Sequence, residues 1–407
     1  MRPVARKKEN LESLTQATIT VAQDGTPMMD GRPVGKGGGP CPLEIPVGCA
    51  VPPTWPPPPD FFEQIIICFS RGKDSLVLLH RALATYPKDR LLVVTNLLGD
   101  EHEGMIEEVK AICAHLGLPL LFTWKNEKRC SQFGPEPPAE VMDLMLSLVR
   151  RNKARLDRNR AAVQAVDADG ADGEDLEERS VWPGSQTPFC TSNGKSGPTD
   201  VVLANLERAW KMASTGRESA WPGNQAPFCT SEGKAQPTNK LVKAQRGSRL
   251  LILTGERRQE SVSRSFKPEY SIRSASPTVP RLVLWRRMIL DWTEQEVYSF
   301  LDQNRISLPE AYALGYSRYS CVLCVHKSMA EQTLSFTLEW RRAAARVALE
   351  EELHSPFWAY TYGEHQGWRA IWELTYGPWK GIPAEQPPIR PEALALIEGL
   401  RKCKRAA

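Results

Sequence analysis

Hydrophobic runs alternate with polar segments along the first half of the chain. Apolar residues at 65–69, 91–97 and 118–124 have the length and composition of buried strands. Between them, residues 75–85 and 102–116 carry apolar side chains at the spacing of one helical face. Strands that alternate with helices over short connections favour parallel pairing with right-handed crossovers. The pattern therefore predicts an α/β domain built on a parallel sheet.

The same pattern returns after a less regular middle. Residues 249–256 and 281–289 contain apolar runs that predict two more strands. Thr293 and Glu296 fit a capping box, which predicts a helix from there to about residue 304. The last part of the chain has helical periodicity and many tryptophans, and it predicts a helical C-terminal extension with a packing role.

Composition divides the chain into three parts. Residues 1–60 are rich in proline and glycine, which predicts a disordered leader. Residues 61–330 hold the strand and helix pattern, and residues 331–407 form the predicted helical extension. Within the middle part, the acidic stretch 165–178 is expected to be a flexible, solvated loop.

A tandem duplication follows this acidic loop. The segment 180–199 recurs as 219–238, with 14 of 20 positions identical at an offset of 39. One pair of copies is fewer than a solenoid needs, so we interpret it as a local duplication. Only the second copy stands shortly before the strand predicted at 249–256, and we expect this copy to be the functional one.

Composition and charge limit the class of protein. The chain is 41% hydrophobic and 25% charged, as in soluble globular proteins, and its net charge of +4 gives little support to direct nucleic-acid binding. The sequence contains no apolar run of membrane-spanning length, and its N-terminus lacks the apolar core of a secretory signal. We therefore expect a cytoplasmic protein whose ten cysteines are free thiols or metal ligands.

The segment SRGKDS, residues 70–75, interrupts a predicted strand and helix with polar residues. It is not a Walker A loop, because Ile67 stands where that motif has its first glycine and Asp74 where it has Ser or Thr. A strand-to-helix turn with free N–H groups still favours an anion. The backbone approach, the charge and the hydroxyls come from Gly72, Lys73, Ser70 and Ser75. The alternative is an ordinary polar turn.

An arginine cluster follows the strand predicted at 249–256. The segment TGERRQESVSR places its arginines at the carboxyl end of that strand, where open α/β sheets bind ligands. Guanidinium groups match the oxygens of phosphate and sulfate. The arginines are Arg257, Arg258 and Arg264. The alternative is a surface cluster of ion pairs with Glu256 and Glu260.

Two cysteines stand three residues apart in the segment CVLC. Cys321 and Cys324 have the spacing at which two thiolates reach one metal or cluster, or form a redox disulfide. Zinc bound with His326 and plain buried cysteines are the alternatives.

Five motifs in order resemble one known family. They are SRGKDS, FCTSEGKAQP, TGERRQESVSR, ILDWTEQEVYSFL and PEAYALGYSRYSCVLC. Together they look like the PP-loop adenine-nucleotide α-hydrolase superfamily, in its phosphoadenosine-phosphosulfate (PAPS) reductase-like branch. The resemblance covers roughly residues 61–330 and implies a Rossmann-like, parallel-sheet PP-loop domain.

The resemblance also implies a site and its ligands. The ligand is ATP or an adenylyl-sulfate-type nucleotide, with Mg²⁺ if it is ATP, and an iron–sulfur cluster occurs in some members. Catalysis would fall to Lys73, Arg257 and Arg264. The nucleotide would be held by Ser70, Gly72, Lys73, Asp74, Ser75, Asp100, Lys234, Gly255, Arg257, Glu260 and Ser261. A metal or cluster would be bound by Cys229, Cys321 and Cys324, with Cys190 as a possible fourth ligand.

Two departures from the family pattern shape the functional hypothesis. The loop lysine is present, whereas reductases proper usually lack it, and the tail RKCKRAA has no Glu-Cys-Gly motif. Both favour an ATP pyrophosphatase or sulfurtransferase over thioredoxin-linked reduction. The alternatives are a DNA-phosphorothioation-type sulfurtransferase, which would reach nucleic acid only through a partner, and a nucleotide-sensing module without turnover. The sequence identifies neither the sulfur donor nor the acceptor.

Overall fold

The structure is a computed structural model. The residues that it describes are 19–21, 27–29, 32–33, 43–45, 49–151, 153–154, 157–158, 229–276, 281–319, 321–324, 327–354 and 367–405. The acidic loop, the first duplicated copy and the start of the second copy lie outside these ranges, as do Cys190 and His326.

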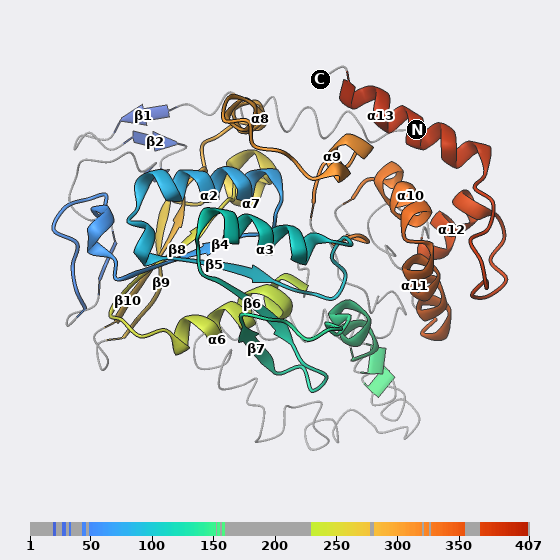
Figure 1. Cartoon of the computed structure of the whole chain (residues 1–407), viewed down its shortest axis with the longest axis horizontal. Helices are drawn as coiled ribbons and strands as arrows, with labels where there is room; N and C mark the ends of the chain where they lie inside the picture. The colour runs from blue at the N-terminus through green and yellow to red at the C-terminus, as the bar shows by residue number, and fades with distance from the viewer. Residues whose placement is uncertain are drawn as a thin grey trace, which may run out of the picture.

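A seven-stranded sheet forms the centre of the molecule (Figure 1). Its strand order is β7-β6-β5-β4-β8-β10-β9. The bounds are β4 (Gln64–Cys68), β5 (Leu91–Asn96), β6 (Leu120–Lys125), β7 (Ser131–Gly134), β8 (Arg249–Thr254), β9 (Tyr270–Ser276) and β10 (Arg281–Arg287). The five inner strands pair in parallel, and β7 and β9 are antiparallel edge strands. The predicted α/β class with a mainly parallel sheet is confirmed.

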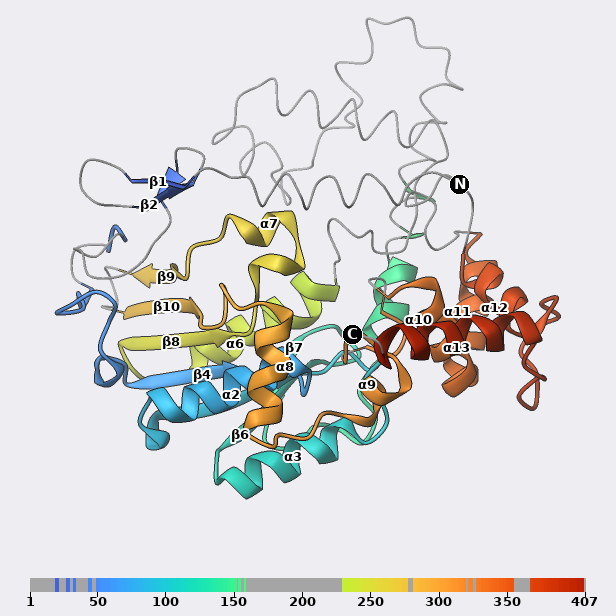
Figure 2. The same ribbon diagram turned by 90° about the horizontal axis from the view of Figure 1, so that it is seen from above.

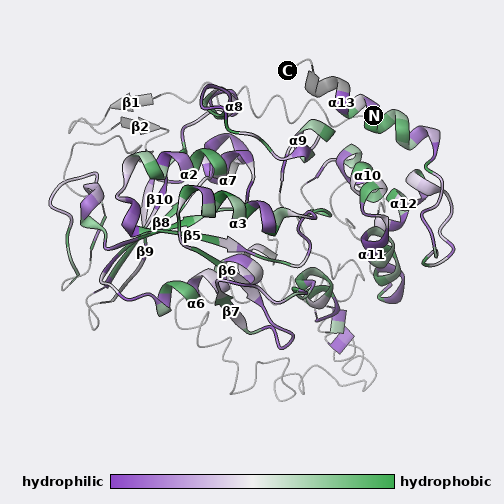
Figure 3. Ribbon diagram, in the orientation of Figure 1, coloured by the Kyte–Doolittle hydropathy of each residue, from purple (hydrophilic) through white to green (hydrophobic). Residues whose placement is uncertain are grey.

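Both faces of this sheet are covered by helices. Helices α2 (Lys73–Thr85) and α3 (Met105–Leu116) lie on one face, and α6 (Gln236–Ala244) lies on the other (Figure 1). Side chains of β4 alternate between them, since Ile65 belongs to the core cluster of α2 and Ile66 to that of α6. Strands buried on both faces need continuous apolar runs. The inner strands accordingly show as hydrophobic in Figure 3.

The predicted elements agree with the structure within a few residues. The five apolar runs form β4, β5, β6, β8 and β10. Helix α8 (Glu294–Gln303) begins at the predicted capping box, where the Thr293 hydroxyl accepts a hydrogen bond from the Glu296 amide. The two edge strands, β7 and β9, were not predicted. Both are more polar than the inner strands, because edge strands are not enclosed on two sides.

The packed part of the chain starts before Phe61, the predicted end of the leader. Cys49 is only 8% exposed and belongs to the main core cluster. The ring of Trp55 contacts Tyr270 of β9 at a centroid distance of 5.0 Å. Three short strands also lie within the predicted leader, namely β1 (Ile19–Val21), β2 (Pro27–Met29) and β3 (Arg32–Pro33). Part of the proline-rich segment is therefore bound to the edge of the sheet.

The helical C-terminal region is confirmed. After α9 (Glu310–Leu314) it comprises α10 (Met329–Leu338), α11 (Trp340–Glu352), α12 (Trp368–Tyr376) and α13 (Pro391–Arg405). These last four helices gather beyond one end of the sheet (Figure 2). Their residues Phe336, Trp368 and Trp372 belong to a second core cluster, which also includes Val322 and Leu323. None of the helices in the described ranges is long and apolar enough to cross a membrane.

Candidate active site

The segment 70–75 forms the turn between β4 and α2, at the carboxyl edge of the sheet. Gly72 precedes the first residue of α2 in an extended conformation. The Ser75 hydroxyl donates to the Gly72 carbonyl at 2.8 Å and accepts from the Ser70 amide at 3.3 Å. A Cβ on Gly72 would stand 3.2 Å from the Tyr319 carbonyl oxygen, which is a tight contact. The turn is thus compact and favours glycine at this position.

Arg71 of this turn was not predicted to have a role, and it anchors the turn. It adopts a left-handed conformation with φ 63°, and its side chain is almost fully buried. Its guanidinium lies 3.0 Å from the Glu108 carboxylate of α3 and donates to the Ser307 carbonyl at 3.2 Å. An isolated SRGKDS string gives no sign of these contacts, because both partners are distant in the sequence.

Lys73 lies at the first position of α2 and is 5% exposed, although a lysine in a polar turn would be expected to face solvent. Its Nζ lies 3.3 Å from Asp74 and 3.2 Å from Glu294, and it donates to the Ser317 carbonyl at 3.4 Å. Its backbone amide donates to the Tyr312 hydroxyl at 3.0 Å. Residues of α8 and α9 and the segment that follows α9 therefore cover the lysine, which the local sequence does not indicate.

Arg257 reaches the same place from the end of β8. Its Nε lies 2.5 Å from Asp74 Oδ1, and the residue is 4% exposed. Asp74 therefore forms ion pairs with both Lys73 and Arg257. Lys73 follows β4 and Arg257 follows β8, and these two strands are neighbours in the sheet. Gly255 allows this approach, since a Cβ there would stand 3.0 Å from the Asp74 carbonyl oxygen.

The remaining residues of the arginine segment divide between two roles. Arg264, in the short helix α7 (Val262–Ser265), forms an ion pair with Glu260, and burial lowers the pKa of Arg264. Ser261 is the residue before this helix. Arg258 contacts Asp291 and donates to two backbone carbonyls, which is a structural role. The alternative of ion pairs with Glu256 and Glu260 therefore describes Arg264, whereas Arg258 pairs with Asp291 and Arg257 with Asp74.

The second duplicated copy reaches the same edge of the sheet. Its described part begins with the π-helical turn η5 (Cys229–Ala235), which leads into α6. Gln236 accepts from Lys125 at 2.7 Å, and Thr238 donates to Asn96 at 2.8 Å, so this part lies at the ends of β5 and β6. Burial raises the pKa of both Glu101 and Cys321, and Lys234 lies close enough to both for its charge to oppose that rise.

Residues 99–101, which we call the acidic turn, include Asp100, one of the predicted nucleotide contacts, and the Asp100 side chain is buried rather than open to a ligand. Asp100 is 2% exposed, lies 3.2 Å from Arg346, and accepts from the Leu323 amide at 3.2 Å. The neighbouring Glu101 accepts from the amides of Leu98 and Gly99, and burial raises the pKa of Glu101 to about 7. The structure thus gives Asp100 partners inside the protein, although it lies at the predicted edge.

The two cysteines of CVLC lie beside this acidic turn. Cys321 pairs with Glu101 in an isolated antiparallel bridge, and burial raises the pKa of its thiol. Cys324 is half-buried. A cluster needs four ligands, and the described side chains contain no group of three or more His, Cys, Asp or Glu placed to hold a metal ion. Of the predicted cluster ligands, the described side chains include only Cys321 and Cys324, because Cys190 and the side chain of Cys229 lie outside them.

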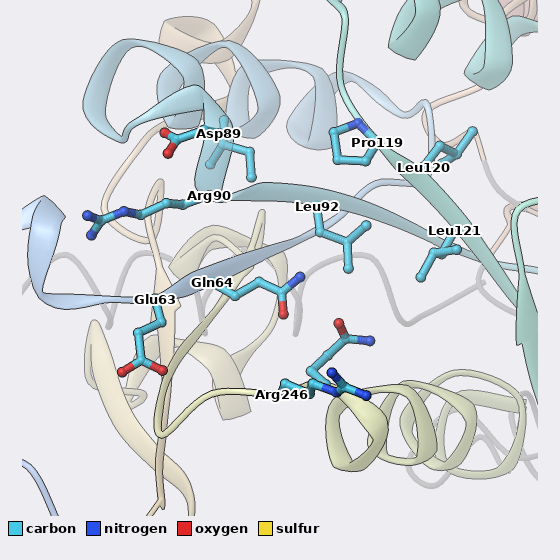
Figure 4. Close-up of a pocket in the computed structure, with 11 residues that line it drawn as sticks. Glu63, Gln64, Asp89, Arg90, Leu92, Pro119, Leu120, Leu121 and Arg246 are labelled. Atoms are coloured by element: carbon cyan, nitrogen blue, oxygen red, sulfur yellow. The ribbon is translucent and has the colours of Figure 1, made fainter.

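A cavity of about 350 Å³ opens at the opposite edge of the sheet, between the amino ends of β4, β5 and β6 (Figure 4). Its rim is polar, with Glu63, Asp89 and Arg246. The turn 70–75 lies at the other edge of the sheet, after the carboxyl end of β4. Open α/β sheets bind ligands at their carboxyl edge. We therefore place the candidate site at the turn 70–75, which the protein's own side chains fill, and not at this cavity.

A known family is similar to a segment of the chain that includes residues at the carboxyl edge of the sheet. Residues 201–327 match the family described as the phosphoadenosine phosphosulfate reductase domain. The chain resembles this family. The PAPS reductase-like segment contains Lys234, Arg257 and both cysteines of CVLC, whereas the turn 70–75 precedes it.

Two individual proteins resemble parts of the chain. An uncharacterised 37.8 kDa protein from the gpa 5′ region of Escherichia phage 186 is 31% identical over 104 residues, which are 26% of this chain and 30% of the phage protein. The chain thus matches less than a third of that relative's length. The crystal structure of PAPS reductase from Candida auris, a phosphate complex, aligns with a TM-score of 0.33 at 12% identity, over 64% of this chain and 83% of that one.

Proposed function

We propose that the chain is a PAPS reductase-like enzyme of sulfur chemistry that binds an adenine nucleotide on residues 70–75. The observation that carries the proposal is the meeting of Lys73 and Arg257 on Asp74, at the amino end of α2. A helix amino end, a lysine and an arginine together attract phosphate or sulfate. The family match over residues 201–327 supports nucleotide-linked sulfur chemistry.

The cations act by electrostatic stabilisation. Lys73 is shared between two carboxylates, of which Glu294 has a side chain 55% exposed and Asp74 one 20% exposed. A nucleotide phosphate takes the place of the exposed one, while Asp74 continues to orient Lys73 and Arg257. Preoriented cations in a water-poor site stabilise the charge that develops at the α-phosphorus or on the leaving group.

Two reactions fit this arrangement. Attack of water or of an acceptor oxygen on the α-phosphorus of ATP breaks the α–β phosphoanhydride bond and releases pyrophosphate, and Mg²⁺, if bound, would neutralise charge on the phosphate oxygens. Mg²⁺ is bound mainly by phosphates with one or two carboxylates, and Asp74 would supply one. Attack of a thiol on the sulfur of an adenylyl sulfate would instead break its S–O bond, release AMP and leave a thiol S-sulfonate, from which a second thiol would release sulfite as the two thiols form a disulfide. The intact lysine and the tail without Glu-Cys-Gly favour the first reaction.

An assay of both products tests the proposal. Purified protein is incubated with ATP, with and without sulfide, and with adenylyl sulfate in the presence of a dithiol. We expect pyrophosphate release from ATP that Lys73→Ala abolishes and Lys110→Ala, a change in a partly exposed lysine of α3, leaves intact. Nucleotide binding without either product would favour the sensing module, and no binding at all would refute the proposal.

A further inference from the structure

Arg346 is a buried arginine in the C-terminal extension that contacts the candidate site. It lies on α11, is 1% exposed, and approaches Asp100 at 3.2 Å and Asp143 at 3.1 Å. A buried ion group of this kind is often no more stabilising than an apolar core of equal volume. Its presence where α11 meets the acidic turn therefore calls for a role besides packing.

Asp100 extends this contact to the two-cysteine turn, which we define as residues 321–324. Its carboxylate accepts from the Leu323 amide at 3.2 Å, and its carbonyl accepts from the Val322 amide at 2.7 Å. Both N–H groups between the cysteines thus point to one aspartate, which Arg346 holds from the other side.

The carbonyl groups of the two-cysteine turn are bound by α10 and the residues just before it. The Val322 carbonyl accepts from Lys327 Nζ at 2.7 Å and from the Ser335 hydroxyl at 2.8 Å. The Cys324 carbonyl accepts from Gln332 at 2.5 Å. With its amides on Asp100 and its carbonyls on these side chains, the turn has a single fixed backbone conformation.

The same stretch of chain continues to the phosphate turn. A few residues before Cys321, the Ser317 carbonyl accepts from Lys73 Nζ, and the Tyr319 carbonyl stands against Gly72. A shift of the two-cysteine turn would therefore be felt at the residues that surround Lys73. Active-site geometry is sensitive to displacements of this size.

We propose that Arg346 is a positioning residue, which acts through Asp100 to hold the two-cysteine turn at the carboxyl edge of the sheet. The C-terminal extension then completes the site instead of only packing beside it. This inference rests on the proposed function for its effect on turnover, but the positioning itself is a property of the fold.

Hydrogen exchange read by mass spectrometry tests the positioning directly. In Arg346→Met, we expect the amides of residues 98–101 and 321–324 to exchange about 10- to 100-fold faster, because a hydrogen-bonded charge is lost. The strands β4 and β8 should keep their protection. Arg346→Lys should restore part of the slow exchange, and Arg369→Met, which removes an exposed ion-paired arginine of α12, should change neither segment.

Activity gives the second arm. Turnover in Arg346→Met should fall about 100-fold, whereas the nucleotide dissociation constant stays within about threefold, because Lys73 and Arg257 retain Asp74. Exchange that is unchanged at residues 321–324 in Arg346→Met, or that rises equally over the whole domain, would overturn the proposal. If Arg346→Met does not fold, Arg346→Lys should show a smaller rise that is confined to residues 98–101 and 321–324, and a rise spread over the whole domain would overturn the proposal. A wild-type protein without turnover would refute the proposed function, and the exchange data would still decide the role of Arg346.

Discussion

At the scale of single residues, we expect the charge balance around Asp74 to determine what the proposed site binds. Asp74 is shared by Lys73 and Arg257, and Lys73 is shared in turn by Asp74 and Glu294. The Lys73–Glu294 pair has an exposed partner, so it is weak and easily exchanged. The Arg257–Asp74 pair is largely buried, so it should persist when a ligand binds. We therefore expect a ligand to displace Glu294 from Lys73 and to leave the Arg257–Asp74 pair in place.

Replacing Glu294 should strengthen nucleotide binding. In Glu294→Gln, the phosphate no longer competes with a carboxylate for Lys73, and we expect affinity to rise about two- to fivefold, the range of an exposed ion pair. Isothermal titration calorimetry with ATP measures this, and Glu398→Gln on the exposed side of α13 serves as the control. Weaker binding in Glu294→Gln would mean that the carboxylate helps to hold the ligand.

Replacing Arg257 should weaken binding. Arg257→Ala removes a charged hydrogen-bond donor from the site while Asp74 keeps Lys73 as a partner, so we expect a loss of roughly 1.5–3 kcal/mol in nucleotide binding. Calorimetry on Arg257→Ala and on Arg258→Ala separates the two neighbours, because Arg258 faces Asp291. An unchanged affinity in Arg257→Ala would remove this arginine from the site.

At the scale of elements, the segment from α9 to the two-cysteine turn packs against the turn 70–75. Tyr312 of α9 accepts from the Lys73 amide, and Tyr319 stacks on His102 with ring centroids 4.8 Å apart. The sequence shows a motif rich in tyrosine at this place, but not its contact with residues 70–75. Such long-range contacts depend on the crossover connections of the sheet, which periodicity alone does not give.

The stack on His102 predicts a pH dependence of stability. Burial lowers the pKa of His102 from 6.5 to about 3, so between these values the unfolded chain binds more protons than the folded one. Stability contributed by this residue should therefore rise with pH across that window and be lost as the pH falls. His102→Phe keeps a ring for Tyr319 but cannot titrate. Urea unfolding measured from pH 4 to 7 should show a free energy of unfolding that rises less steeply with pH in His102→Phe than in the wild type. An equal rise in both proteins would contradict the lowered pKa of His102.

The duplicated segments give a prediction at the same scale. The described part of the second copy lies at the ends of β5 and β6, and Lys234 lies within electrostatic range of Cys321. Deleting residues 180–218 should leave nucleotide affinity within about twofold, whereas Lys234→Ala should lower it about tenfold. Calorimetry on the two variants decides between the copies. If the deletion abolishes binding and Lys234→Ala does not, the first copy is the functional one.

At the scale of the whole molecule, the inner strands and their parallel pairing could be predicted from the sequence pattern, but the order of the strands and the enclosure of residues 70–75 could not. Apolar runs and the capping box of Thr293 predicted the inner strands and α8, because strands buried on both faces carry a strong local signal. The roles of Arg71, Glu294 and Arg346 could not be predicted. Each role depends on a partner that is distant in the sequence. Without knowledge of that partner, a charged residue is predicted to lie on the surface.

The C-terminal helices have contacts in the structure that their sequence did not predict. Their tryptophans predicted packing, and Trp368 and Trp372 do pack in a core cluster that also includes Val322 and Leu323. Helix α11 contacts the acidic turn through the buried Arg346, which approaches Asp100, and through Arg342, which donates to the Glu101 carbonyl at 2.7 Å. A truncation before α10 would therefore expose the two-cysteine turn as well as remove a helical unit.

The central claim is that residues 70–75 bind an adenine nucleotide. The most direct measurement is calorimetric titration of ATP and adenylyl sulfate into the wild-type chain and into Lys73→Ala, with circular dichroism as the check on folding. We predict measurable binding of at least one nucleotide to the wild type and its loss in a folded Lys73→Ala variant. Equal affinity in both proteins would show that the nucleotide, if it binds, does so elsewhere.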